Sequence, residues 1–228
     1  MKKDAIFYSS LIMAFSAGFV DTSTFTAANG LFSAHITGNI VVFAYKLSQH
    51  PVMRDFMNLI SLPVFILAII FTKNIDNRFQ NQRGLFVGIG VFLIIAGIGA
   101  YVLKRFNIET GFVYHCMLML IVFAMGIQNT ATRLYINSVF GPTTVMTGNM
   151  TVAIVDLFSY ISTKRTQEKV TELKKSFVLL GGFFIGCIFG ALVSARFGLV
   201  SMLIPGILIS IYYTVSSRKT STSLQQSI

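Results

Sequence analysis

The sequence predicts an all-α integral membrane protein. Of its 228 residues, 54% are hydrophobic and only 11% are charged, whereas soluble domains usually carry about 25% charged residues. The mean hydropathy is +0.72. Several apolar runs approach the roughly 20 residues that a helix needs to cross the apolar core of a bilayer. A third observation is an internal repeat, because the triplet Thr-Gly-Asn occurs at 37–39 and again at 147–149.

The apolar runs predict about six full transmembrane helices. We expect the first over 5–28, as a retained helix, because no short apolar core followed by a small-residue cleavage site marks this stretch as a signal peptide. Asp21 inside the run supports the same interpretation. The other expected helices are the runs 59–72, 84–103, 112–128, 177–195 and 199–213, of which 59–72 is slightly short.

Two matching stretches divide the chain into two structural repeats. GFVDTSTFTAANGLFSAHITGN at 18–39 aligns with GIQNTATRLYINSVFGPTTVMTGN at 126–149 once two residues are inserted. Asp21 then lies opposite Asn129, and both stretches end in the triplet. The expected units are a first transmembrane repeat over 1–108, a second over 109–215 and a polar cytoplasmic tail over 216–228.

Each Thr-Gly-Asn triplet is expected to start a short helix after an irregular segment. In the first half the apolar part ends near Tyr45, before Pro51, so about 12 residues give roughly 18 Å, half of a bilayer. The preceding stretches NGLFSA and VFGPTT contain Gly and Pro, which interrupt helices. Irregular backbone at membrane depth is tolerated only where protein or a water-filled cavity surrounds it.

The number of crossings stays open between six and eight. If both short helices cross, there are eight crossings and the repeats are parallel; if both are re-entrant, there are six and the repeats are inverted. Either arrangement leaves 13 Lys and Arg on the side of the termini and 5 on the other. The excess of Lys and Arg in cytoplasmic loops therefore places both termini in the cytoplasm. It also accounts for the net charge of +10, so we expect no nucleic-acid partner.

A Thr-Gly-Asn triplet at a helix start has the chemistry of an anion site. Free N–H groups and the positive end of the helix dipole attract an anion, glycine allows close approach, and asparagine offers a donor and an acceptor. Interrupted segments at matching positions in two halves point to a transporter binding site. The candidate substrate-binding residues are Thr37, Gly38, Asn39, Thr147, Gly148, Asn149, Asp21 and His35.

Further candidates would provide charge balance or gating. Lys46 follows Asn39 by seven residues, and Asp156 follows Asn149 by seven, so each pair shares one helix face. Lys46 and Asp156 are therefore equivalent in the repeats but opposite in charge. The alternative is that Lys46 extends to the headgroups. The candidates of this second group are Lys46, Asp156, Asn129 and Arg133.

Asp21 and His35 are ionisable residues in or beside a membrane span, where such groups are costly and usually have a partner. An ion pair of Asp21 with Arg133 or with Lys46 is left open. His35 has a side chain that titrates near neutral pH and would couple transport to protons. The alternative is a buried, hydrogen-bonded histidine.

Small residues predict where two helices approach closely. Gly182, Gly186 and Gly190 recur at four-residue spacing in one apolar run. The first helix carries its own stripe of small residues, which includes Ala14 and Gly18. Small residues on a helix face let membrane helices pack closely, so we interpret these glycines as structural.

The triplet segments resemble a known family. GFVDTSTFTAANGLFSAHITGN followed by GPTTVMTGNMTVAIVDL is similar to the YoaK-like family of bacterial multi-pass membrane proteins of unknown function, a domain-of-unknown-function family. Asp21, His35 and the triplet 37–39 match its first motif, whereas Ala34 stands where serine is common. The resemblance covers nearly the whole chain and implies a bacterial inner-membrane location and about six helices. It implies no substrate.

The preferred interpretation is a secondary transporter of a small, anionic solute that binds where the two triplet helix starts face each other near the midplane. The alternative is a non-transporting scaffold or regulatory protein in which the triplets only cap buried helices. No Ser/His/Asp, metal-ligand or nucleotide-phosphate motif occurs, so we expect no enzyme, cofactor or metal. The expected partners are a small-molecule solute and the lipid bilayer, with a homo-oligomer left open, and the expected location is the cell inner (plasma) membrane.

Overall fold

A computed structural model shows an all-helical fold. The residues it describes are 2–49, 52–108, 110–144, 146–162 and 167–225. Within these ranges every regular element is an α-helix or a 3-10 helix. The predicted α class is therefore confirmed.

The helices follow one another with short connections. In chain order they are α1 (Lys2–Ala27), α2 (Ile36–Leu47), α3 (Met53–Leu59), α4 (Ser61–Phe79), α5 (Gln82–Arg105), α6 (Phe112–Leu134), η1 (Ile136–Ser138), α7 (Met146–Ser162), α8 (Gln167–Phe197), η2 (Gly198–Met202) and α9 (Leu203–Gln225). Four described segments are long and apolar enough to cross a membrane: Asp4–Ala27, Gln82–Arg105, Phe112–Leu134 and the 46-residue stretch Val170–Val215, which contains most of α8, all of η2 and the first part of α9. This composition is that of a membrane protein.

The observed helices are longer than the apolar runs that predicted them. The run 177–195 lies inside α8, which starts at Gln167, and the run 59–72 corresponds largely to α4, which ends at Phe79. Hydropathy identifies only the apolar part of a helix, which can lie in the hydrocarbon core of a bilayer. The backbone hydrogen bonds of the helix continue beyond it into residues with polar side chains. For the same reason α9 continues to Gln225 into the expected tail, whose last three residues lie outside the described part.

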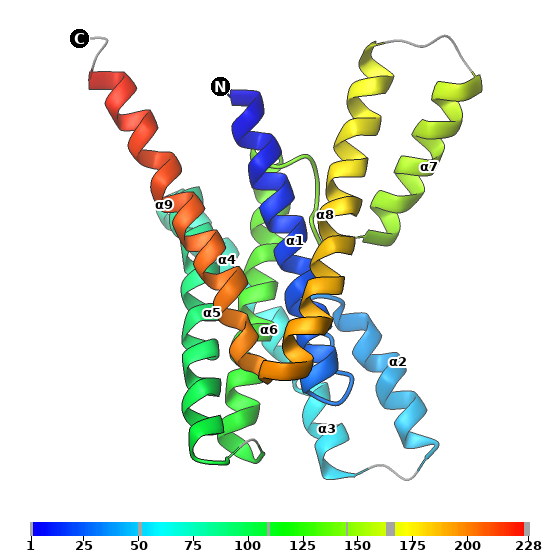
Figure 1. Ribbon diagram of the computed structural model, residues 1–228, viewed down its shortest axis with the longest axis vertical. Coiled ribbons are helices and arrows are strands. Elements are labelled where there is room, and N and C mark those ends of the chain that lie inside the picture. Colours follow the sequence, from blue (N-terminus) through cyan, green and yellow to red (C-terminus); the bar gives the residue numbers. More distant parts are fainter. Residues whose placement is uncertain (1, 50–51, 109, 145, 163–166, 226–228) are drawn as a thin grey trace.

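Both triplets lie at the start of helices that begin partway along the bundle. Figure 1 shows α2 and α7 starting near mid-length on the same side of the α1 and α8 pair and then running in opposite directions. The end of α7 lies at the same end of the bundle as the chain termini, and the end of α2 lies at the other end, beside α3. The 12 residues of α2 span about 18 Å, as predicted, whereas α7 has 17 residues.

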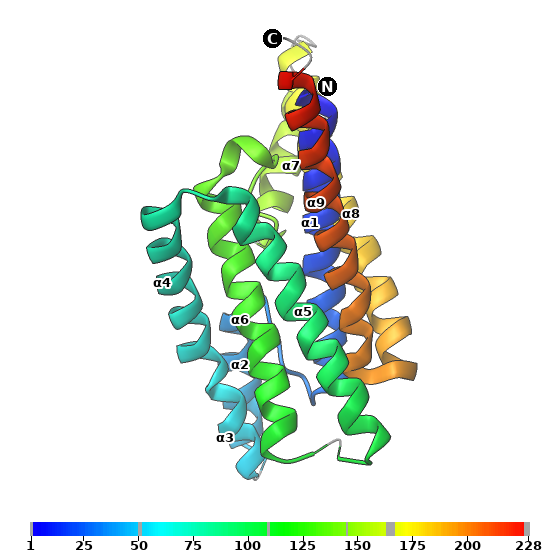
Figure 2. The same ribbon diagram turned by 90° about the vertical axis from the view of Figure 1, so that its left-hand side faces the viewer.

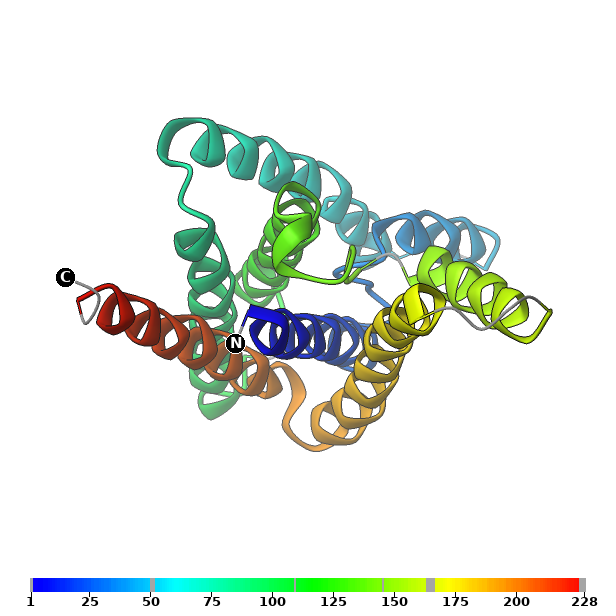
Figure 3. The same cartoon turned by 90° about the horizontal axis from the view of Figure 1, so that it is seen from above.

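The remaining helices form the body of the bundle. In Figure 2, α6 lies between α4 and α5, with which it makes most of its contacts. Seen from above in Figure 3, α1 lies near the centre, and its main partner is α8. The segment that precedes α2 and the segment that precedes α7 both start from helices of this body, α1 and α6.

Glycines bring α1 and α8 into backbone contact, as their spacing predicted. A Cβ added to Gly18 would clash with the carbonyl oxygen of Phe183, and one added to Gly186 would clash with that of Phe15. A Cβ on Gly182 would lie 3.2 Å from the carbonyl oxygen of Leu11. The close contact puts the face of α1 that carries Gly18 against α8 and leaves Asp21, one turn later, to meet the segment before α2.

We predict that Gly186→Ala destabilises the protein, because its new methyl group has no space against the backbone of α1. Overpacking of this kind costs about 1–3 kcal/mol. The matched control is Gly181→Ala on the same helix, where an added Cβ meets no atom within 4 Å. Thermal unfolding in detergent measures both variants, and equal midpoints would contradict the close contact.

Candidate functional site

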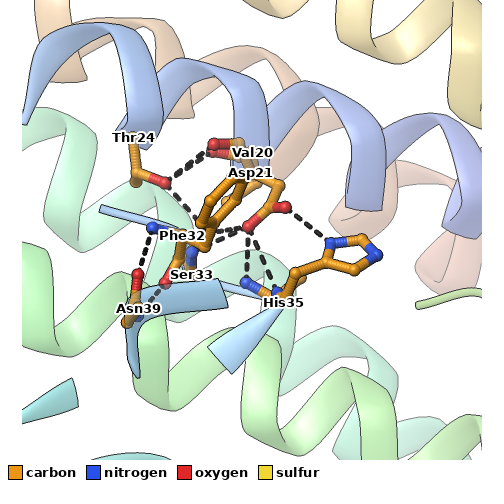
Figure 4. A network of polar contacts seen from close by, with 8 residues as sticks. Val20, Asp21, Thr24, Phe32, Ser33, His35 and Asn39 are labelled. Atoms are coloured by element: carbon orange, nitrogen blue, oxygen red, sulfur yellow. Dashed lines mark hydrogen bonds and ion pairs between the residues drawn. The ribbon is translucent and has the colours of Figure 1, made fainter. Parts of the chain in front are cut away.

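The carboxylate of Asp21 organises the irregular segment before α2 (Figure 4). Its Oδ1 accepts hydrogen bonds from the backbone N–H groups of Ser33 and Ala34, both at 2.7 Å, and of His35 at 3.4 Å. Its Oδ2 accepts from His35 Nδ1 at 2.6 Å. Asp21 is only 4% exposed. A buried charge is costly unless it is paired and hydrogen-bonded, and this carboxylate meets both conditions.

The chain turns back on itself after α1, so that Asp21 meets the returning segment. Asn29 and Gly30 have φ values of 55° and 82°, in a region that asparagine and glycine tolerate better than other residues. Thr24 Oγ1 lies 3.2 Å from Ser33 Oγ and joins α1 to the same segment. The local sequence thus contains both the residues that reverse the chain, Asn29 and Gly30, and a contact that holds the returning segment against α1.

Asn39 fastens the start of α2 to the same segment. Its Oδ1 accepts from Phe32 N at 2.8 Å, and its Nδ2 donates to Phe32 O at 2.7 Å and to Ser61 Oγ at 2.9 Å. A Cβ on Gly38 would lie 2.8 Å from Cδ2 of the Phe32 ring. Gly38 and Asn39 are therefore already engaged with the protein itself.

Thr37 lies in the first turn of α2 and does not cap this helix. His35 occupies the N-cap position of α2, and no side chain caps this helix. Thr37 is exposed in the first turn. Asp21 reaches across from α1 and accepts from the N–H groups just ahead of the helix.

The triplet of the second half repeats one part of this arrangement. Asn149 Nδ2 donates to Pro142 O at 2.8 Å, seven residues earlier, as Asn39 does to Phe32. Thr147 and Gly148 are exposed in the first turn of α7, and Asn149 is half-buried.

The counterpart of Asp21 behaves differently. Asn129 accepts a hydrogen bond from Arg133 Nε at 3.2 Å, within α6, and Arg133 is exposed. Within the described chain, no Asp or Glu hydrogen-bonds to the segment 139–144. The start of α7 therefore lacks the internal carboxylate that the start of α2 has.

Gln128, next to Asn129, reaches the segment before α7 in its place. Its Nε2 donates to Met13 O at 2.8 Å and to Thr143 Oγ1 at 3.1 Å. Gln128 Oε1 and Thr144 Oγ1 are buried and have no hydrogen-bond partner in the described structure. Sequence reasoning overlooked Gln128, although a glutamine in an apolar span is as unusual there as Asn129.

Lys46 forms an ion pair that the sequence did not predict. Its Nζ lies 2.7 Å from Asp55 Oδ1 and also donates to Asn29 O at 3.0 Å. The pairs left open for Asp21, with Lys46 or with Arg133, are both wrong, because each of these basic side chains has another partner. Lys46 is held by α3 and by the turn after α1.

Asp156 has no such partner. It is half-buried on α7, and no ion pair joins it to another described residue. Asp55 and Asn58 were missed because the stretch after Pro51 was not expected to be helical. Their three-residue spacing puts both on one face of α3, and this spacing was the available signal.

We predict that Asp21→Ala destabilises the protein by at least about 3 kcal/mol, because it leaves buried N–H groups and His35 without their acceptor. The matched control is Asn129→Ala at the aligned position, which removes one hydrogen bond and should cost less than about 1 kcal/mol. Thermal unfolding in detergent provides the comparison. Similar losses at the two positions would show that the carboxylate has no special structural role.

Comparison with known proteins agrees with the fold. Residues 9–215 match the family described as "Protein of unknown function (DUF1275)". The chain is 25% identical over 186 residues to the UPF0700 transmembrane protein YoaK of Bacillus subtilis (strain 168), and this alignment covers 81% of the chain and 80% of that protein. No solved structure matches the chain. The family match spans most of the sequence, so the protein is a membrane protein that belongs to the DUF1275 family, as its triplet segments indicated.

Proposed function

We propose that the protein is a secondary transporter of a small, anionic solute, which binds between the starts of α2 and α7. Paired helices that begin inside the membrane after irregular segments are typical of transporter binding sites. Figures 1 and 3 show both starts on the same side of α1 and α8 and close to each other. This placement supports a site made by both triplets.

The observation that carries the proposal is the difference between the two starts. At α2, the carboxylate of Asp21 already occupies the N–H groups of the segment before the helix. At α7, the aligned residue Asn129 is hydrogen-bonded to Arg133. No described carboxylate therefore bonds to the segment before α7. A solute with a carboxylate or a similar anionic group would therefore do at the start of α7 what the Asp21 carboxylate does at the start of α2. Thr147, Gly148 and Asn149 would make the main contacts with the bound anion.

The other candidates have supporting roles in this proposal. His35 is the part of the Asp21 network that faces outward, with 32% of its side chain exposed, so proton coupling would act through it. Thr37, Gly38 and Asn39 would shape the opposite wall of the site. Lys46 and Asp156, which differ in charge, would balance or gate the solute charge.

We further propose six crossings, inverted repeats and cytoplasmic termini in the inner membrane. The support is that α2 and α7 each return toward the end of the bundle from which their preceding segment came, and that they point in opposite directions (Figure 1). In this arrangement 13 of the 18 Lys and Arg lie on the side of the termini, the side that the positive-inside rule assigns to the cytoplasm.

Cysteine accessibility tests this topology. In a variant without Cys116 and Cys187, we expect Ser48→Cys and Asn107→Cys to react with a membrane-impermeant thiol reagent in intact cells. Asn137→Cys should react only after permeabilisation. All three positions are exposed. The eight-crossing arrangement predicts the opposite pattern at each position.

Solute flux tests the site. We expect Thr147→Glu to reduce uptake of small anions into proteoliposomes by at least about tenfold, equivalent to about 1.4 kcal/mol of binding, because the new carboxylate occupies the anion position. A negative charge in the first turn also stabilises a helix, so α7 should stay folded. The assay uses chloride, nitrate, phosphate, formate, acetate and lactate.

Two controls make the result specific. Thr151→Glu places the same charge one turn further along α7 on an exposed position and should leave uptake unchanged. Thr37→Glu at the start of α2 should have a smaller effect than Thr147→Glu, because Asp21 already supplies a carboxylate there. Absence of uptake for the whole panel by the wild-type protein would favour the scaffold alternative instead.

A further inference from the structure

A polar cavity lies at the end of the bundle opposite to the chain termini. Its volume is about 200 Å³, below the roughly 300–1,000 Å³ of clefts that hold drug-sized ligands. Polar residues that line it are Asn29 after α1, Asn58 of α3, Thr110 before α6, and Tyr114 and His115 of α6. Figure 1 places α3 and the start of α6 at this end.

Asn58 is the unpartnered polar group of this cavity. The residue is 8% exposed, yet its amide makes no hydrogen bond within the described chain. An asparagine amide can donate two hydrogen bonds and accept at its oxygen, and this one borders the cavity. A ligand in the cavity would supply the missing partner.

The start of α6 adds a positive field to the same cavity. This helix has 23 residues, no side-chain cap at Gly111 and no acidic residue in its first turn. Its first N–H groups and its dipole therefore favour a negative ligand. The carbonyl groups at the facing end of α1 and in the turn after it already have donors. Ala27 O accepts from Tyr114 OH at 2.8 Å, and Asn29 O accepts from Lys46 Nζ at 3.0 Å.

His115 has one ring nitrogen available to a ligand. Its Nδ1 lies 3.0 Å from Gly111 O. Because a carbonyl only accepts, Nδ1 carries the hydrogen, and Nε2 is the remaining atom.

We propose that this cavity binds a small oxyanion, a carboxylate or a phosphate, as the first site that the transported solute meets. The inference rests on the proposed transport function. The Asn58 amide, the Thr110 hydroxyl and the first N–H groups of α6 donate to the anion. None of the described lining residues is acidic.

Asn58 also connects this cavity with the first triplet helix. Together with Asn39, Lys46 and Asp55, it lines a second, much smaller hollow of about 10 Å³. The ion pair between Lys46 and Asp55 lies along that hollow. An anion that leaves the cavity toward the start of α2 would therefore meet Lys46.

Histidine NMR tests the proposal directly, because the chain has only three histidines. The full-length protein in detergent, with ¹⁵N-labelled histidine, is titrated with inorganic phosphate and separately with acetate. Substitutions His35→Gln, His50→Gln and His115→Gln assign the ring signals. We expect saturable shifts of the His115 signals in at least one titration, and no saturable shift with choline as a cationic probe.

Substitutions of Asn58 define the site. We expect Asn58→Leu to weaken the anion response of His115 by at least about tenfold, the scale of a lost charge-assisted hydrogen bond. Asn58→Asp keeps the side-chain shape, adds a like charge, and should weaken it at least as much, so it serves where the leucine variant fails to fold. The matched control is Asn74→Leu, an exposed asparagine of α4, which should respond as the wild type does.

The outcomes separate this inference from the transport function. Wild-type uptake in proteoliposomes, combined with no saturable His115 response, overturns the cavity site and leaves the transporter standing. A His115 response that depends on Asn58, without uptake of any anion, supports the site and counts against transport. A His115 signal that changes only when phosphatidylglycerol replaces phosphatidylcholine in nanodiscs would assign the cavity to a lipid headgroup and overturn its role for a free solute.

Discussion

The buried carboxylate of Asp21 is the interaction on which the first half of the site depends. An isolated charge at this depth would be prohibitively costly, yet three backbone N–H groups and the His35 ring converge on it. Those N–H groups belong to a segment without helical hydrogen bonds, which also needs partners in a membrane. The charge and the irregular segment therefore stabilise each other, and this mutual requirement positions the start of α2 partway along the bundle.

The close contact of α1 with α8 determines where this carboxylate lies. Gly18, one turn before Asp21, touches the backbone of α8, and Ser23 Oγ donates to Gly190 O at 3.2 Å on the same helix. The His35 ring packs against Phe183 with centroids 5.6 Å apart. The first irregular segment is thus tied to two long helices. The segment before α7 is linked to α1 through Gln128 and Ser10, which accepts from Phe140 N at 2.8 Å.

Local patterns predicted the elements and the close helix contact at the glycines of α8, but not the polar partners of the candidate site. The apolar runs, the glycine spacing of α8 and the triplets at 37–39 and 147–149 each depend on a few neighbouring residues, and the helices appear where those patterns placed them. The ion pair of Lys46 with Asp55 depends on α3, a seven-residue helix too short for a clear apolar period. The bonds of Asn39 to Phe32 depend on how the chain returns after α1, and that path follows from tertiary contacts.

In both halves the irregular segment before the triplet helix needs hydrogen-bond partners for its backbone. The first half provides a carboxylate, and the second half provides neutral side chains. A binding site that keeps its own carboxylate cannot exchange it, because that group is covalently part of α1. A site that must load and release a solute has to leave the corresponding place to a mobile partner. The neutral Asn129, bonded to Arg133 instead of to the segment before α7, satisfies that requirement. In the transporter that we propose, the permanently filled first half would provide a stable frame, and the solute would exchange at the second half.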